Sequence, residues 1–313
     1  MAEKIATRET YGNALVEFGA KYEDLVVLDA DVSSATKTAA FGKKFPERFI
    51  NCGIAEGNMV SVAAGIATTG KIPFASSFAM FAAGRAFEII RNSICYPNLN
   101  VKIGATHAGI SVGEDGASHQ CNEDIALMRV LPNMTIINPA DDVEAKAAVM
   151  AMGTHKGPVY LRFGRLPVPV FNDKDNYEFE IGKGIQLRAT SKDAVAIIAT
   201  GLMVGESLAA YEELAEQGIN ARIVNIHTIK PIDKDIIIKA AQRTGKIITV
   251  EEHSVIGGLG SAVCDVLAEA GMAVPVKKIG VEDTFGYSGP AVDLLKEFGL
   301  CKDNIVRVAK EII

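Results

Sequence analysis

Short apolar runs alternate with longer segments of helical periodicity along most of the chain. In the first half, apolar runs rich in β-branched residues predict strands at 25–28, 48–51, 72–75, 101–105, 134–137 and 159–163. The segments between them predict helices at 11–22, 56–68, 84–95, 123–130 and 142–152. Such alternation is typical of a parallel sheet whose strands are joined by crossover helices.

The alternation stops between Leu166 and Thr190, where two prolines, the polar segment FNDKDNYEFE and two glycines follow one another. It then resumes with predicted strands at 194–199, 222–226, 246–250 and 276–281 and helices at 204–217, 234–243, 261–270 and from 291 onward. We therefore predict an α/β protein of two domains, each a mostly parallel sheet flanked by helices. The predicted domains are residues 1–168 and 191–313, and residues 169–190 form a linker with room for a short strand or two.

Composition narrows the function classes. Of 313 residues, 49% are apolar and 22% charged, with a net charge of −6, so neither nucleic acid nor an anionic membrane is an expected partner. No apolar run reaches the ~20 residues that cross a bilayer, and the N-terminus MAEKIATRET lacks the apolar core of an export signal. Five dispersed cysteines indicate free thiols and a cytoplasmic location. No His or Cys spacing is typical of a metal site, so no metal ligands are expected.

The segment GATHAGISVGEDGASHQ, residues 104–120, concentrates candidate chemistry after a predicted strand. Its glycines allow tight turns, and it carries His107, Glu114, Asp115 and His119. Imidazoles and carboxylates can bind sugar hydroxyls and transfer protons. A solvated surface loop is the alternative. Two histidines and two acids at the carboxyl end of a parallel strand, where ligands bind in open α/β sheets, favour a functional site.

Glu56, Phe78 and Phe81 each admit a structural and a functional interpretation. Glu56 begins a predicted helix of small residues, where a carboxylate either complements the helix dipole or hydrogen-bonds a ring nitrogen of a ligand. Phe78 and Phe81 are three residues apart. That spacing favours core packing over stacking on a flat ligand. For Glu56, the sequence leaves both the helix-dipole role and the ligand contact open.

Arg162 and Arg165 follow the last strand of the first predicted domain, in the segment YLRFGR. Guanidinium groups offer a planar fork to phosphate or carboxylate. Solvated surface charge is an equally good interpretation for both residues. The glycines at 257, 258 and 260 lie between a strand and a helix, but Val263 stands where a dinucleotide-binding loop needs its third glycine. Helix packing better explains those glycines.

Taken together, the segments resemble the C-terminal part of transketolase. The resemblance is carried by GIAEGNM (53–59), FASSFAMF (74–81), THAGISVGEDGASHQ (106–120), PNMTIINP (132–139) and TVEEH (249–253). It covers nearly the whole chain and implies a pyrimidine-binding domain for thiamine diphosphate followed by a transketolase C-terminal domain. Deoxyxylulose-phosphate synthases and the β subunits of 2-oxo acid dehydrogenases share this architecture, but His107 after Thr106 favours transketolase.

The resemblance implies a role for several individual residues. Glu56 falls on the glutamate that contacts the aminopyrimidine ring of thiamine diphosphate, and Phe81 and Phe78 fall on aromatics of the same pocket. The implied sugar-binding residues are His107, Asp115, His119 and, for the sugar phosphate, Arg165, while Arg162 matches a less specific position. Glu56, His107 and His119 are the implied catalytic residues. Ala35 stands where the family has a phosphate-binding serine, after Ser33 and Ser34, so phosphate preference is open.

The Gly-Asp-Gly…Asn segment, which in the family binds the diphosphate and Mg²⁺, has no counterpart in this sequence. The resemblance therefore implies one subunit of a split transketolase, whose N-terminal partner subunit supplies those ligands, with two copies of this chain in a heterotetramer. The implied reaction transfers a two-carbon ketol unit from a ketose phosphate to an aldose phosphate. The alternatives are a deoxyxylulose-phosphate synthase-like enzyme using pyruvate and a non-catalytic scaffold subunit.

Overall fold

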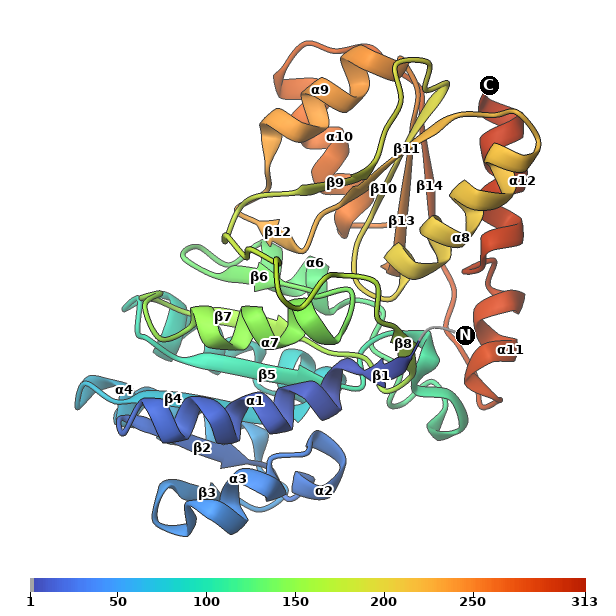
Figure 1. Cartoon of the computed structure of the whole chain (residues 1–313). Coiled ribbons are helices and arrows are strands. Elements are labelled where there is room, and N and C mark those ends of the chain that lie inside the picture. The colour runs from blue at the N-terminus through green and yellow to red at the C-terminus, as the bar shows by residue number, and fades with distance from the viewer. Residues whose placement is uncertain (1–2) are drawn as a thin grey trace.

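Seven strands form the larger sheet of the computed structural model, which describes residues 3–313. Their order is β12-β6-β7-β5-β4-β2-β3, and every neighbouring pair is parallel except β12 and β6 (Figure 1). The strands are β2 (Leu25–Asp29), β3 (Phe49–Asn51), β4 (Ile72–Phe78), β5 (Lys102–Thr106), β6 (Thr135–Ile137), β7 (Val159–Arg162) and β12 (Thr228–Lys230). Because helices cover both faces, β2, β5 and β7 are buried along their whole lengths.

Successive side chains of each strand point to opposite faces of this sheet, and the two faces bury different helices. On β2, Leu25 and Val27 pack with α1 (Thr7–Lys21), α3 (Ala39–Lys44) and α7 (Asp142–Ala151). Val26 and Leu28 join the opposite core with α4 (Glu56–Thr68) and the segment after β4. The remaining helices of this unit are α2 (Ser33–Thr36), α5 (Phe87–Ile89) and α6 (Asp124–Arg129).

The segment after β4 differs from its sequence prediction. Instead of one helix over 84–95, it has a π-helical turn at Phe81–Arg85, the short α5, and a second π-helical stretch at Ile90–Cys95. Wide π turns are uncommon and occur frequently at functional sites. By contrast, α4 spans the predicted residues 56–68.

The second sheet has five strands in the order β14-β13-β10-β11-β9, with β9 antiparallel to β11. These strands are β9 (Ile185–Arg188), β10 (Val195–Ala199), β11 (Ala221–Asn225), β13 (Ile247–Ser254) and β14 (Val276–Val281). The helices of this unit are α8 (Met203–Glu216), α9 (Lys234–Thr244), α10 (Leu259–Glu269), α11 (Ala291–Glu297) and α12 (Lys302–Ile312). The segment predicted as a linker thus contributes β9 to this sheet, and β13 runs four residues beyond the predicted strand end.

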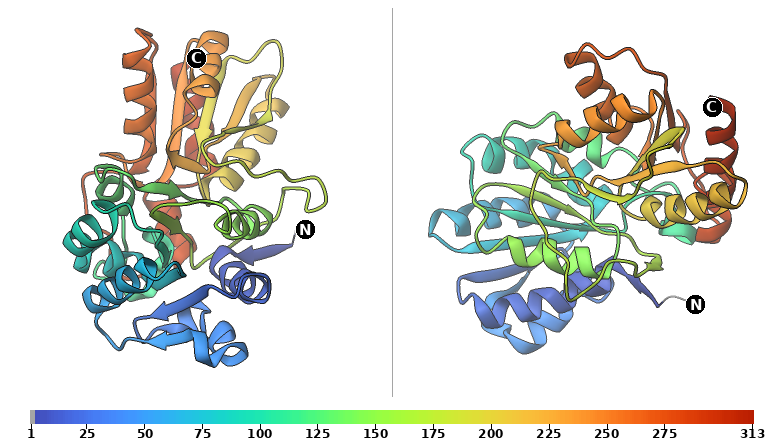
Figure 2. Two further views of the ribbon diagram at one scale, coloured as in Figure 1. Left: turned by 90° about the vertical axis from the view of Figure 1, so that its left-hand side faces the viewer. Right: turned by 45° about the horizontal axis from the view of Figure 1, so that its top comes forward.

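The two units are joined through strand pairing that the sequence analysis did not predict. In sequence, β12 lies between β11 and α9 of the second unit. It nevertheless pairs with β6 at the edge of the first sheet, with Thr228 opposite Ile137. A short antiparallel pair, β1 (Lys4–Ala6) with β8 (Pro167–Pro169), ties the start of the chain to the start of the linker. Figure 1 and the turned view in Figure 2 show the second unit stacked on the β6–β12 edge of the first.

Two further observations concern the whole described chain. All five cysteines lie within residues 3–313 and are free thiols, and Cys95 and Cys121 are buried. Over the same residues, no helix is both long and apolar enough to span a membrane.

Candidate active site

The carboxyl ends of two neighbouring strands bring candidate residues together. β4 ends at Phe78 and β5 ends at Thr106, and these two residues are paired in register. His107, which follows Thr106, stacks on the Phe78 ring with 3.9 Å between ring centroids and 29° between planes. The parallel pairing therefore places residues 29 positions apart in direct contact, at the sheet edge where ligands of α/β proteins bind.

Four rings gather at this point. Phe81 lies 5.7 Å from Phe78, and the His119 ring is 5.1 Å from Phe81 and 6.2 Å from Phe78 between centroids. Phe78 and Phe81 are only partly buried, because Phe78 ends a strand and Phe81 begins the π turn. Their three-residue spacing is therefore not a helical core spacing, and the preference for core packing drawn from it is wrong. The two rings form an accessible aromatic surface beside both histidines.

His107 is held in one tautomer and kept neutral. Its Nε2 lies 3.0 Å from Arg8 Nη1, and its Nδ1 lies 2.9 Å from Thr106 Oγ1. Because a guanidinium only donates, Nε2 accepts, and the single imidazole proton sits on Nδ1. Burial, together with the charges of Arg8 and Arg165, lowers the pKa of His107 to about 3. The residue also adopts φ of +56°, a left-handed conformation that is unusual for a non-glycine residue.

Arg8 is a site residue that the sequence analysis missed. It lies in the first turn of α1, and its Nη1 also donates to the carbonyl oxygen of Ala35 at 3.0 Å. Ala35, noted above for its missing serine hydroxyl, thus contributes its backbone by orienting Arg8. Only the tertiary contact identifies Arg8, because the pattern around it is that of an ordinary helix start.

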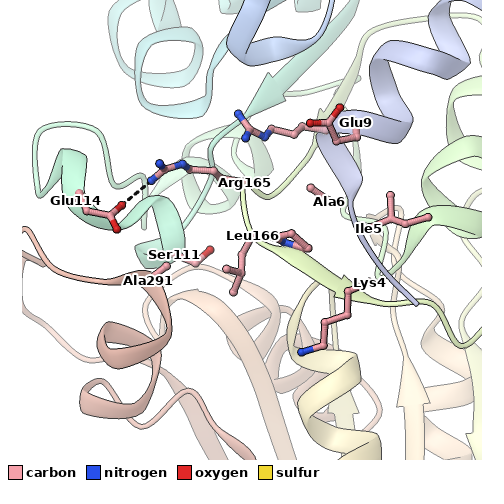
Figure 3. A pocket seen from close by; sticks show the side chains of 11 residues that line it. Lys4, Ile5, Ala6, Glu9, Ser111, Glu114, Arg165, Leu166 and Ala291 are labelled. Carbon is pink, nitrogen blue, oxygen red and sulfur yellow. Dashed lines mark hydrogen bonds and ion pairs between the residues drawn. The ribbon is translucent and has the colours of Figure 1, made fainter. Parts of the chain in front are cut away.

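Arg8 and Arg165 line the same cavity, which has a volume of about 480 Å³. Figure 3 shows Arg165 directed toward Glu114, with which it forms an ion pair of 2.9 Å between Nη1 and Oε2. The same nitrogen donates to the carbonyl oxygen of Val112. Two guanidinium groups at one cavity are suited to a phosphate, carboxylate or sulfonate. Asp115, the last residue of the 3₁₀ turn Ile110–Asp115, is exposed to solvent.

Arg162 has an entirely different environment. Its side chain is buried, its Nε pairs with Asp124 Oδ2 at 2.8 Å, and its Nη2 donates to the carbonyl oxygen of Glu252 at 2.9 Å. These contacts join α6 of the first unit to β13 of the second. Neither interpretation drawn from sequence applies to Arg162, which is neither solvated nor open to a ligand.

Glu56 is the first residue of α4, and its side chain is 5% exposed. Both carboxylate oxygens accept from Arg85 Nη1, at 3.1 Å and 3.3 Å. The Arg85 guanidinium carbon also lies 4.2 Å from the centroid of the Phe81 ring. The place that the Arg85 guanidinium takes, on Phe81 and beside Glu56, thus suits a flat group that stacks on the ring and hydrogen-bonds the carboxyl group. An aminopyrimidine ring has that shape and chemistry, so these residues fit that part of thiamine diphosphate.

The second unit supports the loop at 104–120 through the segment TVEEH. Glu252 Oε1 accepts from the backbone N–H of Ser111 at 2.6 Å. A Cβ at Gly109, where φ is +82°, would lie 2.4 Å from the Glu252 carboxyl carbon, so only glycine fits there. Glu251 caps α10 by accepting from the N–H groups of Leu259 and Gly260, at 2.6 Å and 2.8 Å. Burial raises the pKa of Glu251 to about 7.

Residues 3–313 contain no group of three or more His, Cys, Asp or Glu side chains placed to hold a metal ion. The aromatic and carboxylate groups described above fit a flat heterocycle, and the paired arginines fit an anion. Residues 3–313 therefore offer candidate sites for a ring and for an anionic substrate.

Comparison with known proteins assigns the family. Residues 3–170 match the transketolase pyrimidine binding domain, and residues 182–305 match the transketolase C-terminal domain. The chain therefore belongs to the transketolase family. This confirms the resemblance drawn from the motifs and the predicted α/β fold of two parallel-sheet domains.

Individual relatives refine the comparison. The chain is 54% identical over 301 residues to a Methanocaldococcus jannaschii protein named as a transketolase C-terminal section, covering 96% of this chain and 94% of that one. It is 43% identical to a 6-deoxy-6-sulfo-D-fructose transketolase subunit of Clostridium sp. (strain MSTE9), with 97% and 94% covered. It spans half of human transketolase, at 37% identity over 100% of this chain.

Among solved structures, the chain matches one described as a split gene transketolase, inactive beta4 tetramer. The TM-score is 0.90 at 53% identity, and 98% of each chain is covered. The chain thus has about the length of that chain and of the Methanocaldococcus jannaschii protein, and it spans about half the length of the mammalian transketolases that it matches.

Proposed function

We propose that this chain is the C-terminal subunit of a thiamine-diphosphate-dependent transketolase that transfers a two-carbon ketol unit from a ketose phosphate to an aldose phosphate. One observation carries the proposal: an aromatic surface and a neutral histidine meet at the carboxyl ends of β4 and β5, and Arg85 connects that surface with the buried carboxylate of Glu56. The cavity with Arg8 and Arg165 is linked to this point through the contact between Arg8 and His107. A scaffold subunit would need none of these groups.

In this proposal the residues divide into three tasks. Glu56 hydrogen-bonds the pyrimidine ring of the cofactor, which stacks on Phe81 with Phe78 beside it. Thiamine diphosphate, when bound, supplies the electron sink for cleavage of the bond next to the ketose carbonyl. His107 binds substrate hydroxyls as a neutral imidazole, and the half-buried His119 moves protons between hydroxyl oxygens and solvent.

The third task is to hold the anionic end of the sugar. Arg8 and Arg165 bind it with charge-assisted hydrogen bonds, and Asp115 contacts a sugar hydroxyl at the exposed end of the loop. Binding energy from this end of the substrate positions the reacting bond. The anion is a phosphate in this proposal; a sulfonate, as in the sugar named for the Clostridium relative, has similar shape and charge.

The proposal includes a partner chain. A separate N-terminal subunit of the same cytoplasmic enzyme holds the diphosphate and Mg²⁺, and two copies of this chain associate within a heterotetramer. Support comes from the relatives named as a section and a subunit, and from a relative whose β chains alone form an inactive tetramer.

The test is reconstitution with the N-terminal subunit that carries a Gly-Asp-Gly…Asn segment in the same genome. The chain alone should bind thiamine diphosphate with Mg²⁺ only weakly by calorimetric titration and should transfer no ketol unit. The mixture should bind the cofactor tightly and convert a ketose phosphate and an aldose phosphate. Sub-micromolar binding or sustained transfer by the chain alone would contradict the split-enzyme proposal. Product formation from pyruvate in place of the ketose phosphate would instead identify a deoxyxylulose-phosphate synthase-like enzyme.

A further inference from the structure

Arg85 occupies the space that the proposed cofactor ring needs. Its guanidinium carbon lies 4.2 Å from the Phe81 centroid, and Nη1 donates to both oxygens of Glu56. The group is flat, stacks on an aromatic ring and hydrogen-bonds a buried carboxyl group. In these three respects it resembles a 4-aminopyrimidine ring, although the guanidinium donates where the ring nitrogen accepts.

Arg85 and the ring cannot both be bound in this place. Both require the face of Phe81, and both require the oxygens of Glu56. The charged guanidinium of Arg85 also holds Glu56 as an ion pair, whereas a neutral ring nitrogen accepts a hydrogen bond only from a protonated carboxyl group. The contact between Arg85 and Glu56 and the contact proposed between the cofactor ring and Glu56 therefore exclude each other.

The unassembled chain needs Arg85 because Glu56 is buried. The Glu56 side chain is 5% exposed, and a buried carboxylate without a counter-ion is costly. Arg85, by contrast, is 54% exposed and ends the π turn directly after Gly84. Its side chain can leave without unpacking the core. Glu88, one turn further on, offers an exposed carboxylate as an alternative partner.

We infer that Arg85 is a displaceable counter-ion that closes the pyrimidine site of the unassembled chain and is displaced by the cofactor's aminopyrimidine ring. The inference rests on the proposed function of the same site. It makes ring binding to the lone chain weak because every binding event must first break the Arg85–Glu56 pair. It also protects the lone chain from carrying an unpaired buried charge.

The test uses the chain by itself and the ring alone, 4-amino-2,5-dimethylpyrimidine, with binding followed by NMR line broadening. Arg85→Ala should bind the ring roughly tenfold more tightly than the natural chain or better, because a charge-assisted competitor is gone. Arg85→Lys keeps the charge without the planar fork and should bind with intermediate affinity. In the double variant Arg85→Ala, Glu56→Gln, the gain should be smaller, because an amide N–H is a weaker donor to the ring nitrogen than a protonated carboxyl group.

Arg188→Ala is the matched control. Arg188 is also partly exposed, lies 5.9 Å from the Tyr211 ring centroid and 4.0 Å from Glu212, and belongs to the second unit. Its removal should leave ring binding unchanged. Circular dichroism establishes that each variant is folded. If Arg85→Ala does not fold, Arg85→Lys provides the test. In that case, an affinity of Arg85→Lys for the ring equal to that of the natural chain overturns the inference.

The outcomes separate this inference from the proposed function. Unchanged or weaker ring binding by Arg85→Ala, with normal ketol transfer in the reconstituted enzyme, would overturn the role of Arg85 alone. Tighter ring binding by that variant, without ketol transfer by any reconstituted enzyme, would support the exclusion by Arg85 and contradict the proposed function.

Discussion

The carboxylate of Glu252, on β13 of the second unit, accepts a hydrogen bond of 2.6 Å from the backbone N–H of Ser111 in the first unit. Both groups are buried, and the bond anchors the 3₁₀ turn Ile110–Asp115, which leads from His107 to the cavity. The geometry of the candidate substrate loop is therefore held by a residue of the other domain.

Replacing Glu252 with Ala should loosen this turn. The Ser111 N–H would lose its acceptor inside the protein, which typically costs about 1–3 kcal/mol in the free energy of unfolding. Amide hydrogen exchange should accelerate across residues 109–116, and denaturant unfolding should shift to lower concentration. Glu252→Gln, which retains an acceptor oxygen, is the matched control and should keep most of the protection. Equal exchange in both variants and the natural chain would show that the bond does not hold the loop.

Replacing Glu56 with Gln should stop catalysis without unfolding the chain. In the proposed site the carboxyl group exchanges a proton with the pyrimidine ring, and Gln cannot do so. Exchange of the cofactor C2 proton in the reconstituted enzyme should slow by roughly 10²–10⁴-fold, the usual contribution of general acid–base catalysis. Glu216→Gln, at an exposed carboxylate of the second unit, should leave exchange intact. Near-normal exchange in Glu56→Gln would assign Glu56 to the helix start alone.

Replacing Arg165 with Ala should separate substrates by their charge. Loss of one charge-assisted contact costs about 1.5–3 kcal/mol, so KM for phosphorylated sugars should rise roughly 10- to 150-fold. KM for the unphosphorylated analogues should change little, because the sugar hydroxyls meet other residues. Steady-state kinetics with both substrate types in the reconstituted enzyme measures the difference. Equal losses on both would place Arg165 in the support of the loop through Glu114 and Val112.

Replacing Arg162 with Ala should destabilise the fold. The change leaves Asp124 buried without its partner, which typically costs about 3–5 kcal/mol in the free energy of unfolding. The double variant Arg162→Ala, Asp124→Asn should recover part of this loss because no buried charge remains. Thermal and denaturant unfolding of the lone chain measure both. A stable Arg162→Ala chain would show that the Asp124 pair contributes little to the contact between the units.

His107 should remain neutral throughout the ordinary working range of pH. Burial, aided by the Arg8 charge, lowers its pKa to about 3, whereas the unfolded chain binds that proton near pH 6.5. The stability associated with neutral His107 is therefore fully present above pH 6.5 and is lost as pH falls toward 3. NMR of the imidazole Cε1–H should show no titration between pH 5 and 8, and Arg8→Ala should raise the pKa. In the His107→Asn variant, stability should fall less steeply below pH 6.5, by up to ~1.4 kcal/mol per pH unit.

A histidine signal that titrates near pH 6.5 and disappears in His107→Asn would contradict this prediction. The assignment of the Nδ1–H tautomer is tested by the same spectra, because ¹⁵N shifts distinguish a protonated from an unprotonated ring nitrogen. Thr106→Val removes the acceptor of that proton and should alter the tautomer balance.

The local sequence pattern was sufficient to predict many of the helices and strands. Residues 56–68 form the predicted helix, and the strands that end at Phe78 and Thr106 were predicted within a few residues, because periodicity and turn chemistry act over a few neighbouring positions. The motifs were likewise sufficient for the family. The loop at 104–120 was identified as a candidate site because its histidines, acids and glycines are adjacent in sequence.

What the sequence could not determine depends on contacts between distant segments. Arg162 and Arg165 are three residues apart and chemically identical, yet one is buried against Asp124 and the other lines a cavity, because one belongs to a central strand and the other lies beyond its end. The same holds for Arg8, which gains its position only when α1 packs beside the end of β5. The pairing of β12 with the first sheet depends on an open strand edge that no local pattern reveals. The sequence by itself determined the elements, the family and the chemistry of one loop; the tertiary structure decided which charges face each other, because burial and distance exist only once the strands are side by side.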